Sequence, residues 1–227
     1  MLAVLYDVHG NLPALEAVLA DAGAAGATRF VLGGDYALFG PWPAETVDRL
    51  RSLDARWIRG NGERWTAHPA DAPGNDLVQR AIEAARDLLG EAVVAELGEL
   101  PETLTVGDAR FVHGSPPSDV RSFLPQPAAD EPELLAGVGE ERLLFGHTHL
   151  QFRRRSARAV ELINPGSVGM PFDGDPRAGY ALIGDDGDVE LRRVVYDRVG
   201  SAAAVRERFP HFGETIARRI ERAAFDV

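Results

Sequence analysis

The chain has 227 residues, of which 45% are apolar and 26% charged, and its formal net charge is −11. This composition allows a sizeable core and lacks the low-complexity runs of disordered chains. The acidic balance argues against binding of long nucleic acids, which requires a basic face. No cysteine is present, so disulfides, cysteine-based zinc sites and thiol nucleophiles are excluded.

The N-terminus reads MLAVLYDVHG, without the basic residues that begin a secretory signal, and its apolar run stops at Asp7. No stretch approaches the roughly 18 apolar residues of a membrane span. We therefore expect a cytoplasmic protein without membrane contact, folded as one domain over residues 1–227. The sequence leaves open whether the chain forms a homo-oligomer.

The first half of the chain alternates between short apolar runs and helical patterns. The patterns predict strands at residues 2–6, 29–35 and 55–61, and helices at residues 12–24, 43–53 and 75–97. An alternation of strands and helices is typical of an α/β layer that places its ligands at the strand ends.

The second half is richer in strand patterns. Turn residues predict hairpins around Gly107 and over residues 184–188, and two helices close the chain. Residues 115–133 are rich in proline and irregular, which is typical of a functional or disordered loop. Two packed sheets with helices on both sides are the architecture that these patterns favour.

The stretch GNGE at residues 60–63 has two interpretations. Asn-Gly favours a tight hairpin turn, since both residues tolerate a positive φ. Alternatively, the side-chain oxygen of Asn61 binds a metal ion, and Gly62 leaves the next position without a side chain.

Metal-binding side chains follow several predicted strands: Asp7, His9, Asp35, His113, His147 and His149. The paired residues of DVH and GHTH are two positions apart, so an extended chain would point both members of each pair to the same side. Their oxygen and nitrogen donors suit divalent first-row metals. Each motif alone also fits an ordinary turn or a hydrogen-bonded histidine, but their joint occurrence at successive strand ends indicates a metal site.

The ordered motifs DVH, GGD, GN, VHG and GHTH resemble the calcineurin-like metallophosphoesterase superfamily, in particular its compact bacterial phosphoesterases. The resemblance extends over nearly the whole chain, through DVHGNLPALEAVL, GDYALFGPWPAETVDRL, VHGSPPSDVRSFL and INPGSVGMPFDGDPRAGYALI. It implies an α/β fold of two packed mixed β-sheets flanked by helices, a four-layer αββα sandwich.

The resemblance also implies two divalent metal ions, with Mn favoured over Fe, Ni, Co or Zn. The first ion would be held by Asp7, His9, Asp35 and His149. The second would be held by Asp35, Asn61, His113 and His147. In this arrangement Asp35 bridges the ions, Asn61 is a ligand rather than a turn residue, and a metal-bridging water or hydroxide is the nucleophile.

Position 62 departs from the family pattern. Many members have a histidine there that assists the leaving group, whereas this chain has Gly62, so the general acid is unassigned. His68 is a candidate substitute, against the alternative of an exposed loop residue. Glu63 either orients a ligand or is an exposed charge.

Two further residues are candidates for substrate contact. Asn11 is expected to cap the first helix and to touch phosphate. Arg121 lies in the irregular 115–133 segment and could bind substrate, or be a solvated surface arginine.

The function that follows is a dinuclear-metal phosphoesterase, with a small phosphodiester as the favoured substrate. Phosphomonoesters and dinucleoside polyphosphates remain alternatives within this class. A non-catalytic metal-binding or scaffold protein on the same fold is the alternative from another class, and Gly62 is the feature that favours it. A metal-dependent amide hydrolase is a third alternative. The order of motifs argues against it, because such enzymes typically resemble a barrel with an H-x-H pair on the first strand, whereas here D-x-H comes first and H-x-H comes last.

Overall fold

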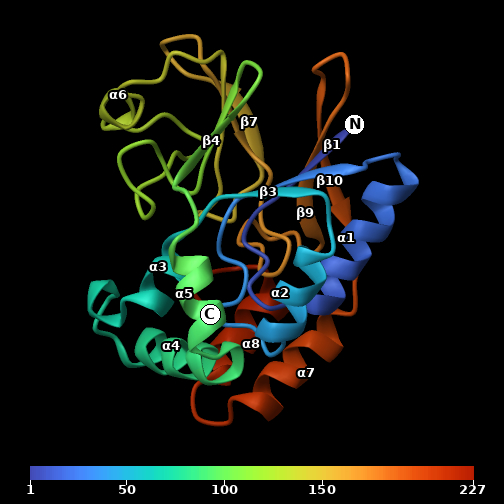
Figure 1. Cartoon of the computed structure of the whole chain (residues 1–227), viewed down its shortest axis with the longest axis vertical. Helices are drawn as coiled ribbons and strands as arrows, with labels where there is room; N and C mark the ends of the chain where they lie inside the picture. The colour runs from blue at the N-terminus through green and yellow to red at the C-terminus, as the bar shows by residue number, and fades with distance from the viewer.

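The computed structural model describes residues 1–227 and contains two five-stranded β-sheets (Figure 1). Sheet A joins strands from both ends of the chain, in the order β10 (Val189–Val194), β9 (Ala178–Ile183), β1 (Leu2–Leu5), β2 (Arg29–Leu32) and β3 (Ala55–Trp57). Strands β1, β2 and β3 are parallel, and β9 is antiparallel to both of its neighbours. The carboxyl ends of the three parallel strands therefore lie at one edge of the sheet.

Sheet B is formed by the middle of the chain, in the order β4 (Thr103–Val106), β5 (Ala109–Val112), β6 (Arg142–Leu144), β8 (Glu161–Asn164) and β7 (Phe152–Arg155). Strands β5, β6 and β8 are parallel to one another, whereas the two outer strands are antiparallel. Both sheets are thus mixed, as expected.

Most helices gather on the side of sheet A, and α6 alone lies beside sheet B (Figure 1). The helices are α1 (Leu12–Ala24), α2 (Pro43–Arg51), α3 (Asn61–Ala67), the 3₁₀ turn η1 (Pro69–Asp71), α4 (Asp76–Leu89), α5 (Glu91–Gly98), α6 (Glu131–Leu134), α7 (Arg198–Arg208) and α8 (Gly213–Arg222). None of them is long and apolar enough to span a membrane.

Alternation along the strands divides the core into layers. In β1, Ala3 and Leu5 pack against the helices, whereas Val4 packs against sheet B. The core between the sheets also contains Phe111 and Ile163 from sheet B. The outer face of sheet B is covered by the segment from 123 to 138, which packs buried apolar residues on it: Phe123, Leu134, Leu135 and Val138.

The structure confirms the expected α/β fold of two packed sheets flanked by helices and corrects several element boundaries. Strand β2 ends at Leu32, before two glycines, and β3 ends at Trp57. The expected helix at 75–97 is two helices, because Gly90 has a φ of 77° and interrupts it. The hairpins at Gly107 and at residues 184–188 are confirmed.

The irregular 115–133 segment is ordered in this structure. It buries Phe123 against sheet B and ends in the first residues of α6. Arg154 on β7 attaches this segment to sheet B: it donates to the Leu124 carbonyl at 2.9 Å and pairs with Glu131. This segment and α6 form the fourth layer of the fold.

Candidate metal centre

The seven expected metal ligands lie close together after the carboxyl ends of the central strands. Asp7 and His9 follow β1, Asp35 follows β2, and Asn61 is the first residue of α3 after β3. On sheet B the ligands follow β5 and β6: His113, His147 and His149. Because Asn61 begins a helix, the hairpin interpretation of GNGE is wrong.

The backbone of this site is unusual. Five of the ligands adopt a positive φ that side-chain-bearing residues rarely adopt: Asp7 (55°), His9 (49°), Asp35 (57°), His147 (66°) and His149 (58°). Such conformations cost free energy and collect at functional sites. The expectation that DVH and GHTH are extended is therefore wrong: β1 ends at Leu5 and β6 at Leu144, and turns with left-handed residues bring the side chains together.

One carboxylate oxygen lies at the centre of the cluster. Oδ1 of Asp7 lies 3.4 Å from Nε2 of His149, 3.8 Å from that of His113 and 3.9 Å from that of His9. This oxygen is buried and has no hydrogen-bond partner, whereas Oδ2 accepts from the amide of His147 at 3.0 Å. A buried carboxylate oxygen without a donor is costly, and a bound cation would satisfy it.

Backbone carbonyls orient three of the four histidines. Nδ1 of His9 lies 2.9 Å from the Leu38 oxygen, Nδ1 of His113 lies 2.8 Å from the Gly33 oxygen, and Nδ1 of His149 lies 2.5 Å from the Met170 oxygen. A carbonyl only accepts, so Nδ1 carries the proton and donates it. This leaves the lone pair of Nε2 free and pointed into the cluster, as in metal-binding histidines.

Two of these free nitrogens face each other. Nε2 of His9 lies 3.0 Å from Nε2 of His149. Burial and the nearby His149 together lower the pKa of His9 to about 3, so the imidazole of His9 is neutral at physiological pH. Two lone pairs at this distance repel each other, whereas nitrogen ligands about 2.1 Å from a shared metal ion are about 3 Å apart. The pair therefore fits a metal ion.

Asp35 faces both halves of the cluster. Its Oδ1 lies 3.4 Å from Nε2 of His113, and its Oδ2 lies 3.9 Å from Nε2 of His9. Burial raises the pKa of Asp35 to about 7, and the carboxylates of Glu63 and Asp7 act in the same direction. Burial lowers the pKa of His113, but the carboxylates of Asp35 and Asp7 outweigh this effect, so the pKa of His113 is raised.

Asn61 and His147 complete the side of the cluster near His113. One terminal atom of the Asn61 side-chain amide lies 2.8 Å from Nδ1 of His147 and 3.0 Å from Nε2 of His113. An amide oxygen at that position would converge with both nitrogens on one ion. Burial lowers the pKa of His147 to about 4, with help from His113, so its ring is neutral and competent to bind a metal.

The donors form two groups whose ligand atoms lie within 4.8 Å of one another: Asp7, His9 and His149, and Asp7, Asp35 and His113. Asp7 is common to both groups, whereas the resemblance assigns the shared position to Asp35. Asp35 also faces both groups through its two oxygens, so the geometry provides a carboxylate between the halves. Neutral nitrogens with buried carboxylates fit divalent first-row ions.

Glu63 supports the loop that carries Asp35. It is 3% exposed, and its carboxylate accepts from the amides of Asp35, Tyr36 and Gly60, each at 2.8 Å. The alternative of an exposed charge is therefore wrong. Glu63 fixes the turn after β2 and the start of α3, which together position Asp35 and Asn61.

The remaining expected residues lie outside the cluster. His68 is exposed at the C-terminal end of α3, about 10 Å along the helix from Asn61. Asn11 caps α1 as expected, and its buried amide is used within the protein, accepting from Ser201 and donating to Gly169. The Arg121 guanidinium is exposed and pairs with Glu133 and Asp130. Substrate contact by Asn11 or Arg121 stays a prediction.

Some supporting residues were not expected from the sequence. Asp119 pairs with Arg64 of α3 through two hydrogen bonds of 2.7 Å. The main-chain carbonyl oxygen of Asp119 lies 3.2 Å from the side-chain amide of Asn61. Phe172 stacks on His149 with ring centroids 4.3 Å apart. No sequence motif announces these contacts, because each joins segments that are distant along the chain.

Comparison with known proteins agrees with this geometry. A family model described as the calcineurin-like phosphoesterase superfamily domain matches residues 1–186. The crystal structure of a metallophosphoesterase from Sphaerobacter thermophilus has a TM-score of 0.84 to this chain at 29% identity, covering 98% of each chain.

Curated relatives are more distant in sequence. A Methanocaldococcus jannaschii protein described as uncharacterized is 27% identical over 241 residues, covering 93% of this chain and 95% of that one. The phosphodiesterase YfcE of Escherichia coli is 27% identical over 191 residues, covering 79% of this chain and 85% of YfcE. Because the family model matches well over half of its residues, the chain belongs to the calcineurin-like phosphoesterase superfamily.

Proposed function

We propose that the protein is a phosphodiesterase that acts on small phosphodiesters with two divalent metal ions. The observation that supports this most directly is the set of donors around Oδ1 of Asp7, with Nε2 of His9 and Nε2 of His149 facing each other at 3.0 Å. Oδ1 of Asp7 is buried without a hydrogen-bond donor, and a bound cation would satisfy it.

The proposed first ion is held by Asp7, His9, Asp35 and His149. The proposed second ion is held by Asp35, Asn61, His113 and His147. The orientation of Asp35 supports a bridging role, since one oxygen faces His113 and the other faces His9. Mn²⁺ is the favoured ion, because the site mixes carboxylate, amide and imidazole donors and contains no thiolate.

Two divalent ions supply a water of lowered pKa and neutralise charge on the phosphoryl oxygens. The residues of the chain then have defined tasks. The carbonyls of Leu38, Gly33 and Met170 keep three imidazoles in the tautomer that presents Nε2. Glu63 holds the loop of Asp35 in place. Burial excludes water from the ligands and strengthens electrostatic interactions at the site.

The preference for diesters is supported by two observations. Position 62 has no side chain to protonate a leaving group, so substrates with stable leaving groups are favoured. The relative YfcE is named a phosphodiesterase at 27% identity. Phosphomonoesters and dinucleoside polyphosphates are the alternatives within the class.

The test is hydrolysis of bis-p-nitrophenyl phosphate against p-nitrophenyl phosphate in Mn²⁺, with metal content measured on the same samples. We expect faster cleavage of the diester. Asn61→Ala and His147→Ala should each lower kcat by more than about a hundredfold, because each removes a ligand of the second ion. His211→Ala is the matched control, since His211 is exposed and lies outside the cluster.

Absence of turnover of both esters in Mn²⁺, Ni²⁺, Fe²⁺ and Zn²⁺, with the metals bound, would instead support the non-catalytic metal-binding protein. Faster cleavage of the monoester would support a phosphomonoesterase at the same site.

A further inference from the structure

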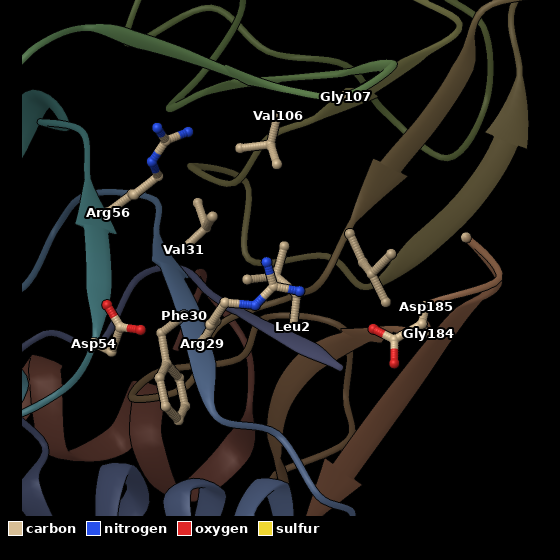
Figure 2. A pocket seen from close by; sticks show the side chains of 12 residues that line it. Leu2, Arg29, Phe30, Val31, Asp54, Arg56, Val106, Gly107, Gly184 and Asp185 are labelled. Carbon is tan, nitrogen blue, oxygen red and sulfur yellow. The ribbon is translucent and has the colours of Figure 1, made fainter.

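A cavity of about 660 Å³ lies at the opposite end of the sheets from the candidate metal centre. It opens between the amino ends of the parallel strands of sheet A and the β4–β5 turn (Figure 2). Leu2 begins β1 and Asp7 lies two residues beyond the end of that strand, so at most about 16 Å of chain separates the cavity from this ligand. Ligand-sized pockets have volumes of this order.

Part of the wall of this cleft is apolar. Leu2 of β1 and Ile183 of β9 line it from sheet A, and Val106 lines it from sheet B. All three pack against the edge of the core between the sheets. The cleft is therefore the place where that core ends and the two sheets separate.

Two arginines lie on the face of sheet A that is turned toward sheet B. Arg29 is paired with Leu2 across the β1–β2 ladder, and Arg56 is paired with Val31 across the β2–β3 ladder. Val31 is buried in the core between the sheets, and alternation puts Arg29 and Arg56 on the same face. Figure 2 shows the Arg56 side chain extending toward Val106 and the Arg29 side chain extending across Leu2.

Neither arginine is neutralised by a neighbour. Arg142, close by on β6, pairs with Glu161 at 3.2 Å and donates to the Gly187 carbonyl. In contrast, the guanidinium groups of Arg29 and Arg56 make no hydrogen bond and no ion pair in the structure. The acidic lining residues are Asp54, which pairs with neither arginine, and Asp185, which binds the N-terminal amine.

We propose that this cleft is a second binding site, specific for a small organic anion with an apolar body. Each of the two free guanidinium groups can bind a carboxylate, sulfonate or phosphate through charge-assisted hydrogen bonds. The walls formed by Leu2, Val106 and Ile183 bury the apolar part of the same molecule. In a chain of net charge −11, an unpaired arginine pair beside an apolar cleft is selective for such a ligand.

The probe is 8-anilinonaphthalene-1-sulfonate, which combines an aromatic body with a sulfonate and fluoresces when it is bound in an apolar site. The full chain loaded with Mn²⁺ is titrated with the probe. Bound probe is then displaced with octanoate, acetate or octanol. We expect one probe molecule per chain, displaced by octanoate at far lower concentration than by acetate or octanol, because only octanoate has both the charge and the apolar body.

The double variant R29Q/R56Q should weaken probe binding by at least about tenfold, because both charge-assisted contacts are lost. Both side chains are exposed, so the variant should keep its melting temperature. Arg222→Gln is the matched control, since Arg222 is also exposed and unpaired but lies at the end of α8. His147→Ala identifies probe bound at the metal centre.

Equal probe affinity in R29Q/R56Q and the unsubstituted chain would overturn the proposal, as would loss of binding in His147→Ala alone. Equal displacement by octanol and octanoate would also overturn it, because the arginines would then contribute nothing. In that case Arg56 acts only as a charge on the edge strand β3 that prevents this strand from pairing with another chain.

Discussion

The amide of Gly62 donates a hydrogen bond of 2.7 Å to Oδ1 of Asp35. A Cβ at position 62 would lie 2.9 Å from that same oxygen, closer than real Cβ contacts allow. Gly62 therefore has two effects on the site. It lets the start of α3 approach the carboxylate of Asp35, and it leaves position 62 without a side chain that could donate a proton.

Gly62→His should change which leaving groups the protein accepts. An imidazole next to Asn61 would protonate the leaving oxygen, so cleavage of alkyl phosphodiesters should rise by at least about tenfold relative to nitrophenyl diesters. The measurement is the dependence of kcat/KM on the pKa of the leaving alcohol, which should become shallower. Gly62→Ala is the control, because its Cβ would displace the Asp35 carboxylate in the same way but brings no imidazole. An equal change of leaving-group dependence in both variants would contradict a role for the imidazole as proton donor.

Glu63→Ala should destabilise the fold and weaken metal binding together. Three buried amides, those of Asp35, Tyr36 and Gly60, would lose their acceptor, at about 1–3 kcal/mol each. Glu63→Gln keeps one acceptor oxygen and should be intermediate, with metal affinity reduced about 10–100-fold. Thermal melting and competition with a chelator measure the two effects. The exposed Glu133→Gln should change neither.

Phe39 allows a test of backbone strain near the centre. Its φ is 79°, and its ring lies 5.8 Å from that of His9. Phe39→Ala and Phe39→Gly both remove the ring, but only glycine adopts this φ without strain. The glycine variant should be the more stable by about 1 kcal/mol in the free energy of unfolding. A less stable glycine variant in urea titration would show that the conformation costs nothing.

Asp35→Asn should change the pH dependence of stability in the metal-free protein. Burial raises the pKa of Asp35 from 3.8 to about 7, so between these values the folded state binds more protons than the unfolded state. Stability of the unsubstituted protein therefore falls as the pH rises through this window. Asn has no such proton, so the variant should gain stability relative to the unsubstituted chain between about pH 4 and pH 7.

The measurement is urea unfolding at a series of pH values in the presence of chelator, read as the difference between the two proteins. The lowered pKa values of His9 and His147 act oppositely, since stability then rises with pH up to the unfolded histidine value, but they are present in both proteins. A pH-independent difference would contradict the prediction.

Asp7→Asn should abolish binding of the first ion and weaken binding of the second. Asp7 is a proposed ligand of the first ion, and its Oδ1 also lies close to the donor atoms of Asp35 and His113. Metal content by mass spectrometry should therefore fall to at most one equivalent per chain. The exposed Asp108→Asn is the control, and retention of two full equivalents of metal by Asp7→Asn would contradict the assignment of Asp7 as a ligand.

Local patterns in the sequence were sufficient for the framework of the protein. Strand–helix alternation indicated the α/β fold, turns containing Gly and Asp located two hairpins, and Asn11 is a helix cap as its position predicts. Six of the seven candidate metal donors were also identifiable, because Asp and His after apolar runs lie at strand ends, whereas the ligand role of Asn61 comes from the family resemblance. These features depend on residue type and short-range spacing alone.

Tertiary structure decided what those donors do. The Nδ1 partners of the histidines are main-chain carbonyls of Leu38, Gly33 and Met170, and a carbonyl carries no residue-specific signal. Glu63 is buried because α3 packs on the loop after β2, where its carboxylate accepts from the amides of Asp35 and Tyr36. The cleft with Arg29 and Arg56 likewise depends on where the two sheets part, which is set by contacts between residues far apart in the sequence.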